Sequence, residues 1–215
     1  FSQYDLVVAP VLYMVKTGLA DKINAYVKNG GDFVTSYMSG MVNESDNVYL
    51  GGYPGPLKDV TGIWVEESDA VVPGHKTYVS LKDQNYEAGL VCDLIHPETA
   101  KVLAKYANEF YQGTAAITEN QYGQGKAWYV GTKLDHAGLT QLFNHIVLAA
   151  DIESLVAAGN QLEVTKRITK DGKELYFVLN MSNDERELPE KFAGYQDILT
   201  NQPAHKQMKA WDVQV

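Results

Sequence analysis

The sequence has 215 residues, of which 45% are hydrophobic, a length and composition that suit one globular domain and a small second one. Its formal net charge of −9 argues against nucleic-acid binding, which needs a basic surface. Cys92 is the only cysteine, so no disulfide can form within the chain, and this fits a reducing compartment. No apolar run approaches the length of a membrane span.

The first forty residues predict a βαβ unit. Residues 4–10 (YDLVVAP) form an apolar run typical of a strand buried on both faces. Apolar residues then recur at helical spacing between 19 and 27, and Asn29-Gly30-Gly31 would end that helix. Residues 33–38 (FVTSYM) predict a second strand, which implies a parallel pair and places residues 36–40 at its carboxyl end.

The next segment, residues 39–67, is long and irregular. Residues 51–56 (GGYPGP) hold three glycines and two prolines, a density that excludes a helix or strand interior and requires a shaped turn. We expect at least one of Gly51, Gly52 and Gly55 to adopt a positive φ. The aromatic and leucine side chains among them predict a loop that packs on its own domain or on a partner.

Shorter strands are predicted after residue 67, followed by one helix. The candidate strands are 77–81, 89–95, 115–118 and 126–131, and residues 123–125 (GQG) indicate a hairpin between the last two. A helix is predicted from Asp135 or His136 to Ala150, with Leu139, Leu142, Phe143 and Ile146 on one face. The domain boundary is placed within 151–160, so that the first domain covers residues 1–155 and the second 158–215.

The second domain is predicted to be a small antiparallel β-sandwich. Residues 162–169 and 174–180 alternate as strands around the turn signal Asp171-Gly172, and further short strands are expected at 188–189, 195–199 and 209–215. So few residues bury a thin core, so we expect this domain to lean on the first.

Three stretches carry a resemblance to a known family. SGMVNESDNVYLGGYPGPLKDVTGIWVEE and the opening YDLVVAPVLYMVKTGLADKINAYVKNGGDFV resemble the second domain of family 42 glycoside hydrolases, the bacterial β-galactosidases. The tail AWDVQV is similar to the end of that family's small C-terminal β-domain. The resemblance implies that residues 1–155 form a trimerisation domain with an open α/β sheet, flavodoxin-like or like that of class I glutamine amidotransferases. The family's (β/α)₈ barrel, with two catalytic glutamates, would then lie upstream of Phe1.

By this resemblance the chain is a non-catalytic region for oligomerisation and support in a cytoplasmic β-galactosidase that hydrolyses terminal β-D-galactosides with retention. Its partners would be other copies of itself in a homotrimer, together with the catalytic barrels; no nucleic acid, membrane, cofactor or metal is expected. The candidate interface residues are Tyr49, Tyr53, Pro54 and Trp64, which lie in or just after the glycine- and proline-rich loop.

Two other functions remain open. Cys92, His96 and Glu98 suggest an amidotransferase-like hydrolase, because His96-Pro97-Glu98 matches the His-Pro-Glu of class I glutamine amidotransferases. A nucleophile elbow, however, needs small flanking residues, and the apolar context of Cys92 predicts a buried, inert thiol. The other alternative is a carbohydrate-binding module that stacks surface tyrosine and tryptophan on sugars.

Acidic and histidine residues show no catalytic or metal-binding pattern. Glu66 and Glu67 are adjacent and would point to opposite faces of a strand, whereas Glu44 and Asp46 are expected to cap or solvate a turn. A retaining glycosidase needs two carboxyl groups about 5 Å apart across the sugar. The five histidines lack ligand spacing such as HExxH.

Overall fold

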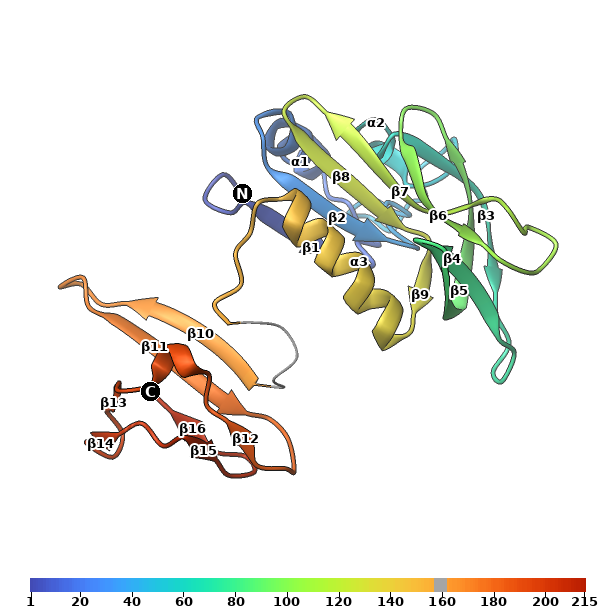
Figure 1. Cartoon of the computed structure of the whole chain (residues 1–215). Coiled ribbons are helices and arrows are strands. Elements are labelled where there is room, and N and C mark those ends of the chain that lie inside the picture. Colours follow the sequence, from blue (N-terminus) through green and yellow to red (C-terminus); the bar gives the residue numbers. More distant parts are fainter. Residues whose placement is uncertain (157–161) are drawn as a thin grey trace. The chain divides into compact units, whose positions relative to one another are not determined.

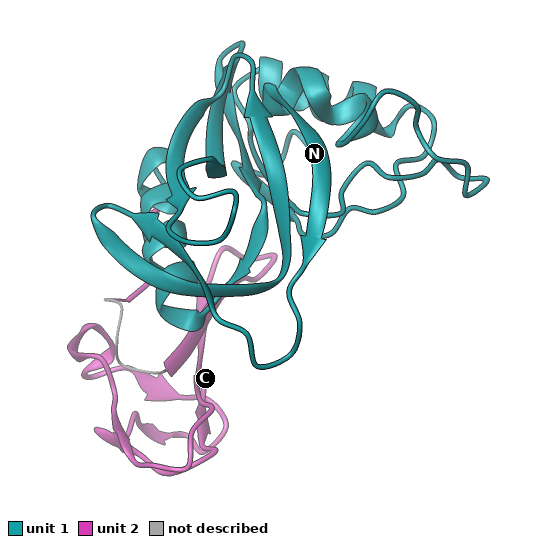
Figure 2. Cartoon of the chain, turned by 90° about the vertical axis from the view of Figure 1, so that its right-hand side faces the viewer, with its two compact units in different colours: residues 1–152 teal, residues 153–215 magenta. Residues whose placement is uncertain are grey.

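A computed structural model of the chain describes residues 1–156 and 162–215, which form two compact units, Phe1–Ile152 and Glu153–Val215 (Figures 1 and 2). Residues 157–160 of the predicted boundary lie outside the described residues. No helix of the described part is long and apolar enough to cross a membrane.

The predicted βαβ unit is present at the start of unit 1. Strands β1 (Leu6–Ala9) and β2 (Asp32–Ser36) pair in parallel, and helix α1 (Leu19–Lys28) connects them. Gly30, with φ 105°, follows the helix end as the glycine pair predicts. All five residues of β2 are buried, because alternate side chains enter the cores on both faces of the sheet.

The remaining strands extend this unit into a nine-stranded mixed sheet within the described residues. The strands are β3 (Ile63–Ala70), β4 (Thr77–Leu81), β5 (Gln84–Pro97), β6 (Lys101–Tyr106), β7 (Ala115–Tyr122), β8 (Gly125–Val130) and β9 (Thr132–Leu134). The order is β1-β2-β8-β7-β6-β4-β5-β3, with β9 beside β5. Strand β5 also pairs back to β7, so the antiparallel part of the sheet is strongly curved (Figure 2).

This topology confirms a mixed α/β unit but not the finer expectation. Among the named strands of this sheet in the described residues, only β1, β2 and β8 pair in parallel, and the other pairings are antiparallel. A flavodoxin-like or amidotransferase-like open sheet is therefore not confirmed. The predicted strands at 77–81, 89–95, 115–118 and 126–131 overlap β4, β5, β7 and β8, respectively. Gly123, with φ 65°, lies in the predicted turn between β7 and β8.

Helices cover both faces of the parallel part of the sheet (Figure 1). Helix α1 and the short α2 (Lys58–Thr61) contribute to a core that includes Phe33, whereas α3 (His136–Ala149) packs on the face that carries Val34 and Trp128. Asp135 caps α3 by accepting a hydrogen bond from the Gly138 amide at 2.7 Å, so the predicted helix start is confirmed. Leu139, expected on the buried face, is exposed instead.

Unit 2 consists of small antiparallel sheets around a core of Val178, Leu188, Phe192 and Met208. Strands β10 (Leu162–Ile168) and β11 (Glu174–Asn180) form the predicted hairpin, and β16 (Val213–Gln214) adds to β11. Two-residue strands make the other sheets: β12 (Arg186–Glu187) with β15 (Gln207–Met208), and β13 (Gln196–Asp197) with β14 (Gln202–Pro203).

The expected strand at 188–189 is wrong, because β12 ends at Glu187 and Pro189 leads into the 3₁₀ helix η2 (Glu190–Phe192). Proline cannot donate to a strand ladder. The antiparallel character of the unit is confirmed, whereas a sandwich is not: the described residues form one three-stranded and two two-stranded sheets.

Candidate subunit interface

The glycine- and proline-rich loop has the shaped backbone that its composition predicts. Gly51, Gly52 and Gly55 have φ values of 90°, 85° and 55°, so the expectation of a positive φ is confirmed at all three. The 3₁₀ helix η1 (Gly55–Leu57) follows and leads directly into α2. The Lys58 ammonium donates a hydrogen bond to the Gly51 carbonyl, which ties this helix back to the turn.

Two glycines allow the loop to pass close to itself. A Cβ added to Gly40 would lie 1.9 Å from the Pro54 carbonyl oxygen, and one added to Gly55 would lie 2.5 Å from the Gly40 carbonyl oxygen. Neither distance leaves room for a methyl group, since carbon atoms in contact sit about 3.5–4.0 Å from their neighbours. Backbone contact between residues 40 and 54–55 therefore depends on glycine.

Three of the four predicted interface residues precede β3, and all three make contacts within unit 1. The half-buried Tyr49 donates its hydroxyl to the Val15 carbonyl at 2.6 Å, and Pro54 is buried. Tyr53 packs beside the core cluster that contains Val65, and its carbonyl accepts the Val65 amide at 2.9 Å. The loop thus packs on its own domain, and whether these residues also contact a partner stays a prediction.

Trp64 is the fourth candidate, and it lies at the start of β3. Its half-buried ring stacks on the His96 ring of β5, with centroids 4.2 Å apart and an interplanar angle of 9°. His96 Nε2 lies 2.7 Å from the Glu66 carboxylate. All three side chains are at least partly accessible, so this aromatic group could be covered by a neighbouring molecule.

Sequence reasoning missed the most exposed large apolar side chain of the described residues, which is Leu50, 96% exposed. Val48 is also exposed, whereas Tyr49 between them turns inward. The order Val48, Tyr49, Leu50 could have indicated this exposure. In an extended chain successive side chains point to opposite sides, so if Tyr49 faces the core, Val48 and Leu50 face away from it.

The groups suggested for thiol chemistry do not assemble. Cys92 is fully buried in β5, with its sulfur 3.4 Å from the Thr132 hydroxyl, and burial raises the pKa of its thiol. His96 is exposed and is paired with Glu66, while Glu98 is exposed beyond the end of the strand. An amidotransferase-like hydrolase is therefore not favoured.

The carboxylates considered as an acid–base pair are either exposed or hydrogen-bonded within the unit. Glu66 and Glu67 are both exposed, at a register shift between β3 and β5. Glu44 accepts hydrogen bonds from the Thr17 hydroxyl and amide at 2.5 and 3.0 Å, and these bonds lower its pKa. Among residues 1–156 and 162–215, no three acidic, histidine or cysteine side chains gather in a way that could hold a metal ion.

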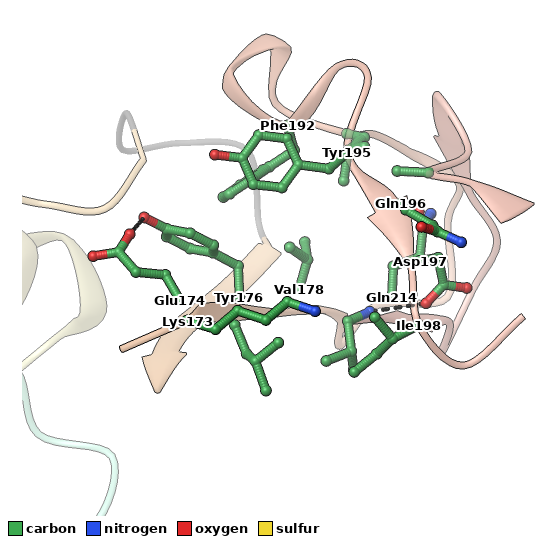
Figure 3. Close-up of a pocket in the computed structure, with 14 residues that line it drawn as sticks. Lys173, Glu174, Tyr176, Val178, Phe192, Tyr195, Gln196, Asp197, Ile198 and Gln214 are labelled. Atoms are coloured by element: carbon green, nitrogen blue, oxygen red, sulfur yellow. Dashed lines mark hydrogen bonds between the residues drawn. The ribbon is translucent and has the colours of Figure 1, made fainter. Parts of the chain in front are cut away.

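Unit 2 contains a pocket of about 290 Å³ lined by Tyr176, Phe192 and Tyr195 (Figure 3). Two of its polar side chains, Asp197 and Gln214, form hydrogen bonds within the unit. Asp197 accepts bonds from the Thr200 hydroxyl at 2.6 Å and from two backbone amides, and Gln214 exchanges two bonds with the His205 backbone. Lys173 and Gln196 also line the pocket, so its geometry alone does not decide between functions; the domain matches given below do not favour a carbohydrate-binding module.

Comparisons with known proteins cover both units. A family model described as the beta-galactosidase trimerisation domain matches residues 1–153. The chain belongs to this family. A second model, the beta-galactosidase C-terminal domain, matches residues 161–215, which follow the trimerisation domain.

Relatives of the trimerisation domain and its C-terminal neighbour are named as β-galactosidases. Beta-galactosidase LacA of Lactobacillus acidophilus is 72% identical over 215 residues, covering 100% of this chain and 32% of the relative. BgaP of Planococcus sp. (strain L4) is 43% identical, covering 94% of this chain and 30% of the relative. The crystal structure of beta-galactosidase from Bacillus circulans sp. alkalophilus matches with a TM-score of 0.90 and 39% identity, covering 99% of this chain and 33% of that chain. The chain therefore spans about a third of the length of the relatives it matches.

Proposed function

We propose that this chain is the C-terminal, non-catalytic region of a family 42 β-galactosidase, and that it serves oligomerisation and support. The observation that carries the proposal is the match of the trimerisation and C-terminal domain models to residues 1–153 and 161–215. The whole enzyme would hydrolyse terminal β-D-galactosides with retention, using two glutamates of a (β/α)₈ barrel outside this sequence.

In this proposal residues 1–155 hold neighbouring subunits together in a homotrimer, and residues 158–215 form the supporting C-terminal domain. Tyr49, Tyr53, Pro54 and Trp64 belong to the contact region, either by touching a neighbour's barrel or by shaping the loop that does. The loop suits this role because its backbone is fixed by internal hydrogen bonds and so loses little entropy when a partner covers it.

Two finer points belong to the same proposal. We propose that unit 1 is related to amidotransferase-like or flavodoxin-like folds. The parallel strands β1, β2 and β8, with helix α1 packed beside them, support this relation. A cytoplasmic location fits a chain whose only cysteine, Cys92, is a buried free thiol.

Light scattering tests the assembly role. We expect the full-length protein to have the mass of a trimer and a variant lacking residues 1–155 to lose it, because the deletion removes the subunit contacts. Circular dichroism of the deleted protein provides the folding control. A monomeric full-length protein, or a trimer that survives the deletion, would contradict the proposed role.

A further inference from the structure

Leu50 is an apolar side chain held out in solvent by a rigid loop. Single exposed leucines are common on protein surfaces, so its 96% exposure alone indicates nothing. The loop that carries it, however, is fixed on both sides of the residue. The Tyr49 amide donates to the Met41 carbonyl at 3.0 Å, and the Tyr49 hydroxyl donates to the Val15 carbonyl. On the other side, Lys58 binds the Gly51 carbonyl.

The turn before Leu50 is ordered in the same way and is polar. The side-chain oxygen of Asn43 accepts hydrogen bonds from the backbone amides of Ser45 and Asn47, both at 3.0 Å. The backbone amide of Asn43 donates to the Asn47 carbonyl at 2.9 Å. Exposed polar residues 44–47 thus lead into Val48 and Leu50, both of which face away from the core. An apolar centre beside a polar rim is the usual composition of a protein–protein contact.

We infer that Leu50, with Val48 beside it, anchors one subunit of the trimer in an apolar surface of the neighbouring subunit. This inference rests on the proposed function, because the trimerisation-domain model is the reason to choose a second copy as the partner. In a cyclic trimer each contact joins two different surfaces, so Leu50 would meet a surface other than the one around Leu50 itself. The anchor is pre-organised, so its burial is opposed by little loss of loop entropy.

Sedimentation velocity of the full-length protein over a dilution series tests the anchor with two variants. Leu50→Asp places a charge in the contact, so we expect it to weaken assembly at least about tenfold, a change equivalent to about 1.4 kcal/mol. Val72→Asp is the matched control, because Val72 is also exposed but lies between β3 and β4. We expect it to assemble like the parent.

The outcomes separate the two proposals. If the parent is a trimer and Leu50→Asp assembles as tightly as Val72→Asp, the anchor is wrong while the assembly function stands. If the parent is not a trimer, the proposed function fails and the anchor fails with it. A photo-crosslinking residue placed at position 50 gives a reading that does not depend on the charged variant folding. It should link subunits, whereas the same residue at position 72 should not; equal crosslinking at both positions would overturn the inference.

Discussion

Cys92 and Asp93 are neighbours on β5, and both side chains are buried, yet they meet different surroundings. Cys92 faces an apolar core cluster that includes Trp128 and Leu142. Asp93 faces the other side of the strand, where its carboxylate accepts hydrogen bonds from the Ser68 and Tyr129 hydroxyls, each at 2.6 Å. Strand alternation thus gives one residue an apolar site and the next a polar one.

We predict that the Cys92 thiol is inert in the folded protein. It is fully buried, and burial raises its pKa, so little reactive thiolate forms and a reagent cannot reach it. A thiol-reactive dye should label native protein only slowly and should label urea-unfolded protein at once. Stoichiometric labelling of native protein within minutes would contradict this.

Removal of the Tyr129 hydroxyl should destabilise unit 1 more at neutral than at acidic pH. Burial raises the pKa of Asp93, and the hydrogen bond from Tyr129 opposes that rise, so Tyr129→Phe should raise the pKa further. A carboxyl group whose pKa is higher in the folded state stabilises the fold below its unfolded pKa, and this contribution is lost as pH rises through the folded pKa. We therefore expect a loss of about 1–3 kcal/mol near pH 7 that shrinks towards about pH 4.

Urea unfolding followed by tryptophan fluorescence at both pH values measures this change. Tyr106→Phe is the matched control, because the buried Tyr106 hydroxyl donates to the backbone carbonyls of Asp93 and Gly131 rather than to a carboxylate. Its removal should destabilise the unit by an amount that depends little on pH. An equally flat result for Tyr129→Phe would mean that Asp93 keeps one protonation state throughout.

At the scale of elements, sequence periodicity predicted those whose side chains alternate against one core. Strands β4 and β11 match their predicted bounds, and α3 begins at its predicted cap. Strand β6 was missed because it begins with Lys101 and Lys105 interrupts its short apolar run, and β9 is only three residues long. The predicted strands at 195–199 and 209–215 overlap β13 and β16, whereas β12 depends on pairing with a distant segment, Arg186 with Met208, and leaves no local pattern.

The same limit applies to the candidate interface. Composition located the loop and its positive-φ glycines, because glycine and proline act on the local backbone. It could not separate the inward Tyr49 from the outward Leu50, because the partner of Tyr49 is the carbonyl of Val15, 34 residues away. Aromatic character therefore selected Tyr49 as a candidate interface residue and passed over the more exposed Leu50.

Alanine substitutions should distinguish the glycines of the loop. Gly55 combines a φ of 55° with a Cβ position 2.5 Å from the Gly40 carbonyl oxygen, so Gly55→Ala should cost about 2 kcal/mol or more. Gly51 has a φ of 90°, but nothing lies within 4 Å of its Cβ position, so Gly51→Ala should cost only about 1 kcal/mol. Urea unfolding measures both. If both variants unfold like the parent, the loop is not rigid, which would also weaken the case for Leu50 as an anchor.

At the scale of the whole molecule, we predict that the 215-residue chain alone does not hydrolyse a chromogenic β-galactoside. Glu66 and Glu67 are exposed on β3, and Glu44 accepts hydrogen bonds from the distant Thr17. Retention requires two carboxyl groups about 5 Å apart across the sugar. The assay should stay at the buffer rate, and a Glu66→Gln, Glu67→Gln double variant controls for contaminating host enzyme. Turnover that disappears in that variant would place chemistry on this chain.

The isolated chain should also assemble more weakly than the full-length protein. In the proposed trimer, part of each contact is made with a neighbour's barrel, which lies outside this sequence. The contact that remains should fall below the roughly 1,000 Å² that stable interfaces usually exceed. We therefore expect light scattering to show mostly monomer at micromolar concentration, with mass that rises as the chain is concentrated. Leu50→Asp should abolish that rise, and Val72→Asp should not. A chain that stays trimeric on dilution to nanomolar concentration would show that residues 1–155 hold the trimer without the barrel.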